Sequence, residues 1–229
     1  MANPELIPDS TSATALAGRS EPRWERRKQD RPGEIIAAAL ELFVERGYAA
    51  TRLEDVAARA GVSKGTVYLY FANKHELFKS VVRRGIVSPL AQVNDMLSGY
   101  RGPMMELLRL LLRGWWTQIG STQLAGIPKL VIAEARNFPE IAEFYYSEVV
   151  QPGTTLFRRI VERGIAEGEF RATDPEALAQ IVMAPMLIIS LWRSSLGAGR
   201  PGTMNPEQLL DTHLDLLQSA LAAGKSGHE

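Results

Sequence analysis

The chain has 229 residues and a mass of 25.3 kDa, and its 26 basic and 26 acidic side chains give a formal net charge of zero. A hydrophobic fraction of 45% is ordinary for a globular protein, and the length leaves room for one small and one larger folded module. The absence of cysteine excludes disulfides and thiolate metal sites and fits a reducing, cytoplasmic location.

The first part of the chain predicts a disordered tail. Residues 1–22 are rich in Pro, Ser, Thr and Ala and show neither the basic start nor the apolar stretch of a secretory signal. A basic run follows, made of Arg23, Arg26, Arg27, Lys28 and Arg31. Such an arm can enter a minor groove or follow phosphates, but a solvated linker without a specific partner has the same composition, so both interpretations stay open.

A first helix is predicted to begin at about Pro32 and to end at Gly47, which suits the left-handed conformation that closes a helix. One apolar stripe at helical spacing predicts its buried face, namely Ile35, Ile36, Ala39, Leu42 and Phe43. We expect Tyr48 to pack back onto this helix rather than to contact phosphate.

The next segment, from residue 51 to residue 78, reads as two short helices and the start of a third. Thr51 and Glu54 have the spacing of a capping box, which predicts the beginning of the first of these helices. Gly61 is expected to end that helix, and Ser63 to cap the next one. This is the layout of a helix-turn-helix, whose second helix enters the major groove of DNA.

The second of these helices is the predicted reader, from Lys64 to about Phe71, and Asn73 is expected to cap the third helix. The polar side chains of the predicted reader helix can reach phosphates or base edges, and its glycine allows close approach of the backbone. The remaining apolar residues of this helix, Val67, Leu69 and Phe71, are expected to pack inward. A surface helix with aromatic residues in the core is the alternative.

Residues from about Pro32 to Val82 resemble the DNA-binding domain of the TetR/AcrR family of bacterial repressors. The resemblance is carried by the segments IIAAALELFVERGY, LEDVAARAGVSKGTVYLYF and NKHELF. It implies an all-α protein, with an N-terminal three-helix helix-turn-helix domain and a larger C-terminal helical domain for ligand binding and dimerisation. By position, it implies DNA contacts at Thr51, Lys64, Gly65, Thr66, Tyr68, Tyr70 and Lys74.

Charge is distributed unevenly along the chain. Residues 19–84 contain 14 basic and 9 acidic side chains, a net charge of +5, which leaves −5 for the remainder. Such asymmetry is expected where a polyanion binds one part of a protein. We therefore predict a DNA-binding domain with a basic arm at residues 23–84, a helical ligand-binding and dimerisation domain at 85–223, and a disordered tail at 224–229.

The C-terminal part is predicted to contain only helices. A long connecting helix from His75 to about Leu97, bent near Pro89, would couple a distant ligand to the reader. Four further helices follow, at about 103–119, 128–135, 139–150 and 152–167. The pairs Asp174–Pro175 and Asn205–Pro206 place a capping residue before a proline and so predict the starts of the last two helices.

The helix from about residue 177 to residue 192 is apolar on almost every side, so both of its faces need to be buried. It is short and interrupted for a membrane span, and we expect no membrane contact. The simpler explanation is a core on one face and a second subunit on the other. With the final helix, it would form the homodimer interface found in the family that the chain resembles.

Large apolar groups of the C-terminal part are candidates for a ligand pocket; any one of them alone is better explained as filling the core or a dimer interface, but we expect some of the group to line a pocket. These candidates are Trp115, Trp116, Phe138, Phe144, Tyr145, Met183, Met186 and Trp192. Polar residues that could orient a ligand are Arg109, Gln118, Glu134, Arg136 and Asn137. The segment LVIAEARNFPEIAEFYYSEVV resembles the corresponding region of multidrug-efflux repressors, which implies hydrophobic inducers.

The predicted function is that of a sequence-specific DNA-binding regulator, a repressor released from a palindromic operator by a small hydrophobic inducer. An activator, or a helix-turn-helix used for protein contacts, stays as an alternative. An all-α enzyme is disfavoured because three histidines and no cysteine offer few nucleophile–base pairs, and no GxSxG, Walker A or HExxH motif occurs. We expect no catalytic residue, no metal site and no cofactor.

Overall fold

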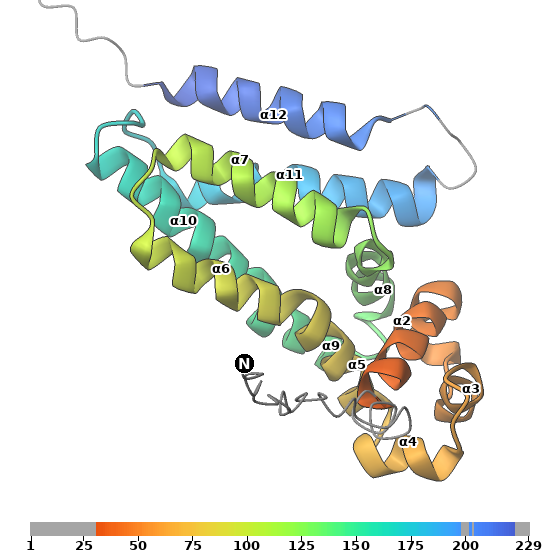
Figure 1. Cartoon of the computed structure of the whole chain (residues 1–229). Helices are drawn as coiled ribbons and strands as arrows, with labels where there is room; N and C mark the ends of the chain where they lie inside the picture. Colours follow the sequence, from red (N-terminus) through yellow and green to blue (C-terminus); the bar gives the residue numbers. More distant parts are fainter. Residues whose placement is uncertain (1–30, 198–201, 203, 223–229) are drawn as a thin grey trace, which may run out of the picture. The chain divides into compact units, whose positions relative to one another are not determined.

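The computed structural model describes residues 31–197, 202 and 204–222, so the two predicted tails and the basic run from Arg23 to Lys28 lie outside the described residues. The described part consists of helices and loops with one isolated bridge between Phe170 and Ala222, which confirms the all-α class. The α-helices (Figure 1) are α2 (Arg31–Ala50), α3 (Leu53–Arg59), α4 (Lys64–Tyr70), α5 (Lys74–Val82), α6 (Ser88–Gly99), α7 (Met104–Trp115), α8 (Gly126–Glu134), α9 (Pro139–Tyr145), α10 (Gln151–Ala166), α11 (Pro175–Leu191) and α12 (Pro206–Leu221).

Helix α2 is the support that the apolar stripe predicts. Ile35, Ala39, Leu42 and Phe43 are almost fully buried. The regular helix is interrupted at Gly47, whose φ of 85° and ψ of 169° are open to glycine and costly for other residues. This glycine therefore breaks the helix at the predicted position, and the chain turns there toward α3.

Buried side chains form two hydrophobic cores, and the first does not stop at the predicted domain boundary after residue 84. It joins Phe43 and Phe78 of the N-terminal helices to Ile127 of α8 and Ile141 of α9. Helix α8 lies between α2 and α11 (Figure 1). The helix-turn-helix and α8–α9 are therefore packed together as one block.

The second core is built from the other C-terminal helices. Leu97 of α6, Leu108 of α7, Ile160 of α10, Val182 of α11 and Leu214 of α12 all contribute buried side chains to it. The chain passes between the two cores three times: from α5 to α6, from α7 to α8, and from α9 to α10.

Each of these three passages contains a π-helical turn: η1 (Arg83–Val87), η2 (Trp116–Gly120) and η4 (Tyr146–Val150). Two of these turns come shortly before a proline, Pro89 after η1 and Pro152 after η4. A proline has no amide to continue the α-helical pattern, so a wider turn can be accommodated there. The irregularity predicted near Pro89 is thus a π turn within a continuous helical run.

The last two long helices begin where the sequence predicts. The side chains of Asp174 and Asn205 accept hydrogen bonds from the first-turn amides of α11 and α12. Apolar side chains nevertheless remain at the surface, with Ile181 and Ile188 of α11 at 53% and 50% exposure and Leu216 of α12 at 65%. By length and composition, the helical run of residues 175–196 is apolar enough to cross a membrane. Of the 18-residue apolar stretch within it, 33% is buried.

Candidate nucleic-acid interface

Local hydrogen bonds build the helix-turn-helix largely as predicted. Helix α3 is followed by Gly61 in the left-handed conformation, with a φ of 65°. The Ser63 hydroxyl accepts a hydrogen bond from the amide of Thr66 at 3.1 Å and caps α4. The Asn73 side chain accepts a hydrogen bond from the amide of Glu76 at 2.9 Å and caps α5.

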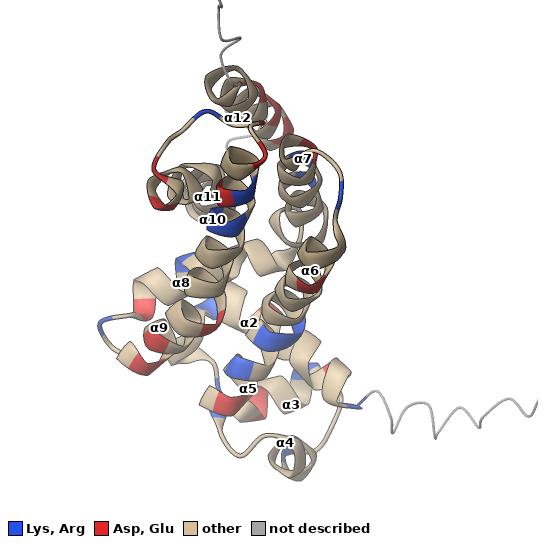
Figure 2. Ribbon diagram, turned by 90° about the vertical axis from the view of Figure 1, so that its left-hand side faces the viewer, with Lys and Arg blue, Asp and Glu red and all other residues tan. Residues whose placement is uncertain are grey.

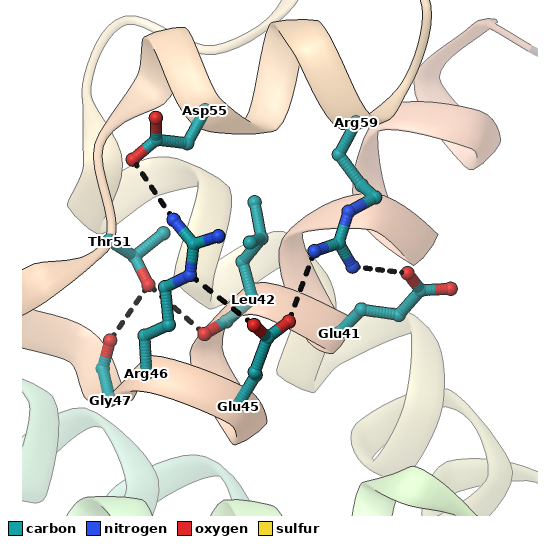
Figure 3. A network of polar contacts seen from close by, with 8 residues as sticks. All are labelled: Glu41, Leu42, Glu45, Arg46, Gly47, Thr51, Asp55 and Arg59. Atoms are coloured by element: carbon teal, nitrogen blue, oxygen red, sulfur yellow. Dashed lines mark hydrogen bonds and ion pairs between the residues drawn. The ribbon is translucent and has the colours of Figure 1, made fainter.

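The predicted capping box at Thr51 is wrong. Helix α3 begins at Leu53 after Arg52, without a hydrogen bond from a capping side chain. The Thr51 hydroxyl instead donates to the carbonyl oxygens of Gly47 (2.7 Å) and Leu42 (3.2 Å), as Figure 3 shows, and Thr51 is 1% exposed. The hydroxyl of Thr51 is therefore engaged with the end of α2, and its side chain offers almost no surface to DNA in this arrangement.

Ion pairs fasten α3 to α2 (Figure 3). The guanidinium of Arg59 donates to Glu41 at 2.9 Å and to Glu45 at 3.0 Å, and Arg46 lies 3.6 Å from Asp55. The hydrogen bond from Arg59 lowers the pKa of the Glu45 carboxyl. These two arginines are therefore occupied within the protein, although they lie in the segment whose charge suggested a DNA contact.

Helix α4 presents a polar and aromatic face to solvent. Val67 is buried at its centre, and the capping residue Phe71 is buried beside it, which anchors one side of the helix. Tyr68 and Tyr70 are exposed at 46% and 41%, as expected of side chains that donate to phosphates. Leu69 is 78% exposed, so its predicted inward packing is wrong, because Val67 and Phe71 already occupy the inward face of this short helix.

The remaining predicted contacts of α4 lie at its N-terminal end. The ammonium of Lys64 is 2.5 Å from the Glu54 carboxylate of α3 and 5.7 Å from the centre of the Tyr68 ring. The Thr66 hydroxyl shares a hydrogen bond with the Ser63 hydroxyl at 2.8 Å, and Gly65 is exposed. The structure thus gathers Lys64, Gly65 and Thr66 at one end of the helix that carries the exposed tyrosines.

Lys74, for which the resemblance implies a DNA contact, has its ammonium engaged with the end of α2. Its ammonium donates to the carbonyl oxygens of Tyr48 (2.7 Å) and Ala49 (3.1 Å) and lies 4.5 Å from the centre of the Tyr48 ring. Burial lowers the pKa of this lysine. Lys74 therefore closes the end of α2, and a phosphate would have to compete with two backbone carbonyls for it.

Two exposed residues of this region, Arg52 and Leu69, were not predicted to contact DNA. Arg52 is exposed in extended conformation directly before α3, with a φ of −112° and a ψ of 150°. Its position at a helix start, where phosphates bind readily, was the available signal. Leu69 gave no such signal, since an apolar residue beside two tyrosines reads as part of a core; once exposed on α4, it suits contact with a thymine methyl.

Three of the predicted pocket residues belong to the core that contains the helix-turn-helix. The ring of Phe138 stands edge-on to Tyr48, with centroids 4.9 Å apart, and Phe144 packs against Phe78 at 6.4 Å. Tyr145 packs against the same core. Tyr48 also stacks on Phe43 at 5.7 Å, which confirms that it packs back onto α2.

The other predicted pocket residues lie elsewhere, so the eight do not form a single cluster. Trp116 donates its indole N–H to Glu207 at 3.0 Å, Trp115 and Trp116 flank Gly120, and Trp192 packs beside Gly197. Met183 and Met186 pack against the second core. A surface groove of about 680 Å³ between α6 and α10 contains none of the eight; it is lined by Leu97, Ser98, Arg101, Arg159, Glu162, Arg163, Ala166 and Glu167.

Within the part of the chain that the structure describes, no group of three or more His, Cys, Asp or Glu side chains is placed to hold a metal ion. Charges of both signs mix on α5 (Figure 2), where Lys79 lies 3.1 Å from Glu76. The arrangement brings together a helix-turn-helix, an exposed reading helix with hydroxyl and ammonium groups, and C-terminal helices packed against it.

Comparison with known proteins assigns both parts of the chain to one family. A family profile described as "Bacterial regulatory proteins, tetR family" matches residues 35–81, and one described as "Tetracyclin repressor-like, C-terminal domain" matches residues 100–212. The transcriptional activator FasR of Mycolicibacterium smegmatis is 36% identical over 98 residues, which cover 38% of this chain and 42% of FasR. The transcriptional repressor KstR2 of Mycobacterium tuberculosis is 26% identical over 152 residues, or 62% of this chain and 70% of KstR2.

Among solved structures, the transcriptional regulator FadR of Bacillus subtilis, in complex with stearoyl-CoA, matches 82% of this chain and 98% of its own with a TM-score of 0.66. At 22% identity this likeness concerns the fold. These relatives are named as regulators and not as enzymes. With its helix-turn-helix in front of a helical C-terminal part, the chain belongs to the TetR family and is a DNA-binding transcriptional regulator.

Proposed function

We propose that this regulator is a homodimeric repressor that binds a palindromic operator and leaves it when a hydrophobic small molecule binds. The observation that carries the DNA-binding part is the exposed face of α4. Lys64, Tyr68, Leu69 and Tyr70 present a charge, an apolar group and two hydroxyls on one short helix of a helix-turn-helix. Such a helix can take base edges and phosphates at the same time.

Dimerisation through α11 and α12 is supported by the apolar side chains that these helices leave at the surface. Ile181, Leu187 and Ile188 of α11 and Leu216 of α12 are all at least 44% exposed. A second copy of the same two helices would remove them from water, which is favourable in proportion to the apolar area. Two reading helices related by a two-fold axis would then recognise half-sites about one helical turn apart, roughly 34 Å, or a multiple of this.

An acyl compound is the ligand class that we propose. Support comes from FadR, which shares the fold and whose structure contains stearoyl-CoA. The second core offers suitable surroundings, because aliphatic side chains dominate it and the flexible Met183 and Met186 pack against it. An acyl chain placed among these helices would remain within an apolar environment.

Release from DNA would follow from the two-core arrangement. A ligand within the second core can change the geometry of the passages to the first core, where η1, η2 and η4 depart from regular α-helix. The helix-turn-helix would then move together with α8 and α9, which share its core. For this to release the operator, the ligand has to bind the released conformation more tightly than the DNA-bound one. The dimer is expected to stay intact throughout.

Repression is the proposed direction of regulation, although the relatives include an activator, FasR, beside the repressor KstR2. A reporter gene with the operator across its promoter separates the two: deletion of the regulator should raise expression, whereas an activator would require its presence. A helix-turn-helix used only for protein contacts would bind no specific duplex. The expected location is the cytoplasm, where the DNA is, and the apolar face of α11 would be covered by the dimer rather than by lipid.

The decisive experiment is selection of genomic fragments by the purified full chain at two salt concentrations, followed by sequencing. We expect a palindromic site, bound more weakly by Leu69→Ala than by the wild type. Leu110→Ala serves as a matched control, because Leu110 is an exposed leucine of α7 at 54%. The opposite outcome is a set of fragments that share no sequence and whose binding depends only on the salt concentration. That result would refute the proposal that the protein recognises a defined operator.

A further inference from the structure

His213 of α12 has a buried ring nitrogen, Nε2, that forms no hydrogen bond within the described part of the chain. Burial lowers the pKa of this imidazole, and a hydrogen bond with the backbone of Val182 in α11 opposes that change. A neutral ring can leave the lone pair of a buried nitrogen unused at a moderate cost. Protonation would add a charge and an N–H without an acceptor, which is far more costly. The fold therefore favours the neutral imidazole.

The surroundings of this ring are apolar because α12 packs on α7 and α11 (Figure 1). Leu214 and Leu217 of α12 are buried in the second core, to which Val182 of α11 also belongs. The contact with the backbone of Val182 places His213 on the side of α12 that faces α11. A protonated ring would thus put its charge between two apolar helices.

The charged groups that join α12 to α7 pair with one another and not with His213. Arg109 of α7 lies 3.3 Å from Asp215, and Arg113 lies 2.9 Å from Asp211. The two remaining acids of these helices are Glu106, which lies 3.9 Å from Arg109, and Glu207, which accepts a hydrogen bond from the Trp116 indole. The aspartates on either side of His213 are therefore committed to arginines of another helix.

Helix α11 supplies no counter-ion either. Its one ionisable side chain is Glu176, which stands in the first turn and lies 3.5 Å from Arg158 of α10. Arg193, in the π turn that follows α11, covers the ring of Trp116 at 5.2 Å. In agreement with this, no neighbouring charge contributes to the pKa of His213.

The rest of the imidazole lies on the face that a second copy is proposed to cover. Leu209, His213 and Leu216 are four and three residues apart, so they share one face of α12. His213 is half-buried and Leu216 is exposed. Regulators of the TetR family function as dimers. A second copy seated on α11 and α12 would take the ring farther from water and make its protonation still less favourable.

We propose that the dimer of this regulator is acid-sensitive: two copies meet through α11 and α12 only while both His213 side chains are neutral, and protonation of these side chains separates the subunits and weakens operator binding. This inference rests on the proposed dimer and adds a mode of regulation to it. It is a route to release that needs no ligand.

The direction of the pH effect follows from the lowered pKa. A histidine whose pKa is depressed by burial contributes stability that is present above its ordinary value of 6.5 and is lost as the pH falls below it. Each histidine can weaken association by at most about tenfold per pH unit, so the two of a dimer can weaken it by at most about a hundredfold per unit. Carboxylates titrate mainly below this range.

The dissociation constant of the full-length dimer, measured by sedimentation at about pH 7.5 and about pH 5.5, tests the proposal. The dissociation constant of the wild type should rise at least about fivefold on acidification, with helix content retained. His213→Gln removes the titrating group and should have the same dissociation constant at both values. His75→Gln is the matched control, because His75 of α5 also has a buried ring nitrogen without a partner, and it should respond to pH as the wild type does.

Two results would overturn the acid-sensitive dimer: a wild type whose dissociation constant does not change, and a His213→Gln protein that responds to pH as the wild type does. A wild type that loses its helix content at the lower pH, instead of separating into folded monomers, would overturn it as well. His213→Leu repeats the test with an apolar side chain in case the glutamine variant does not fold. A wild type that is monomeric at the higher pH would instead refute the proposed dimer itself.

Discussion

The carboxylate of Glu134 accepts a hydrogen bond from the backbone amide of Ala49 at 3.0 Å, so a side chain at the end of α8 closes the end of α2. The two residues are 85 positions apart in the sequence. The contact ties the support helix of the helix-turn-helix to the C-terminal helices at the turn that Gly47 opens. Glu134 is thus engaged with the protein itself, in a place where the sequence suggested a ligand contact.

Replacing Glu134 with alanine should lower the free energy of unfolding by about 1 to 2 kcal/mol, because the amide of Ala49 loses a charged acceptor. Glu134→Gln keeps an acceptor oxygen and should cost less. Urea unfolding measures both variants, with Glu143→Ala on the exposed side of α9 as the control. Equal stability of Glu134→Ala and Glu143→Ala would show that the contact contributes nothing.

Lys74→Met should lower the free energy of unfolding by about 1 to 2 kcal/mol, since the carbonyl oxygens of Tyr48 and Ala49 lose their charged donor. Lys64→Ala should leave the free energy of unfolding close to that of the wild type and weaken operator binding instead. Unfolding curves and operator titrations on both variants distinguish the two roles. A Lys74→Met protein of native stability that binds DNA poorly would restore the phosphate contact that the family resemblance implies.

Glu54 acts as an internal counter-ion of Lys64, so Glu54→Gln should strengthen DNA binding. The expected gain is about twofold to fivefold per reading helix, since an exposed pair is weak, and it should be similar for operator and random duplex. The affinity should also depend more steeply on salt, by a slope of up to about 0.9 per helix, because Lys64 would then displace a counter-ion from DNA without freeing a carboxylate.

Titrations over a range of salt concentrations check this prediction. Glu162→Gln is the control, because it removes the same charge from an exposed arginine–glutamate pair on α10. If Glu54→Gln strengthens binding equally when Lys64 is also replaced, the carboxylate repels phosphate directly and does not act through the lysine.

Arg83 and Glu148 join two of the π turns, with the guanidinium Nε 2.9 Å from the carboxylate. The hydrogen bond from Arg83 holds the pKa of Glu148 below its usual value of 4.5. A lowered pKa in the folded state means that the stabilisation is present above that usual value and is lost as the pH falls through the folded pKa. Being partly exposed, the pair should contribute at most about 1 kcal/mol.

The unfolding free energy of Glu148→Gln should therefore lie below that of the wild type near about pH 7 and approach it below about pH 4. Urea unfolding at both values measures the difference. Glu140→Gln, on the exposed side of α9, is the control for the removal of a carboxylate. A difference between wild type and Glu148→Gln that grows in acid would contradict the direction assigned to the pKa.

Charge placed on the exposed apolar face should separate the subunits. Ile181→Glu together with Leu216→Glu introduces carboxylates where the two copies are expected to meet, and unpaired charges buried in an interface are strongly unfavourable. Sedimentation should then report a monomer of native helix content with weakened operator binding. Met96→Glu on α6, where the methionine is 56% exposed, is the control; a double variant that remains dimeric would place the interface elsewhere.

Features that depend on residues close together in the chain could be predicted from the sequence. The left-handed Gly61, the caps Ser63, Asn73, Asp174 and Asn205, and the family motif all involve partners within a few positions. A side chain that caps the next turn of its own helix needs no knowledge of the rest of the fold.

Features that depend on distant partners were decided only by the tertiary structure. The spacing of Thr51 predicts a helix cap, but its hydroxyl donates to a backbone carbonyl at the end of α2. Lys74 was predicted to contact phosphate, but its ammonium binds backbone carbonyls of α2. The aromatic residues of α9 looked like a pocket, but Phe144 packs against α5. The sequence shows the same type of apolar residue whether its side chain fills a core, lines a cavity or contacts DNA. Only the neighbours that folding brings to it, often from many positions away, determine which of these it does.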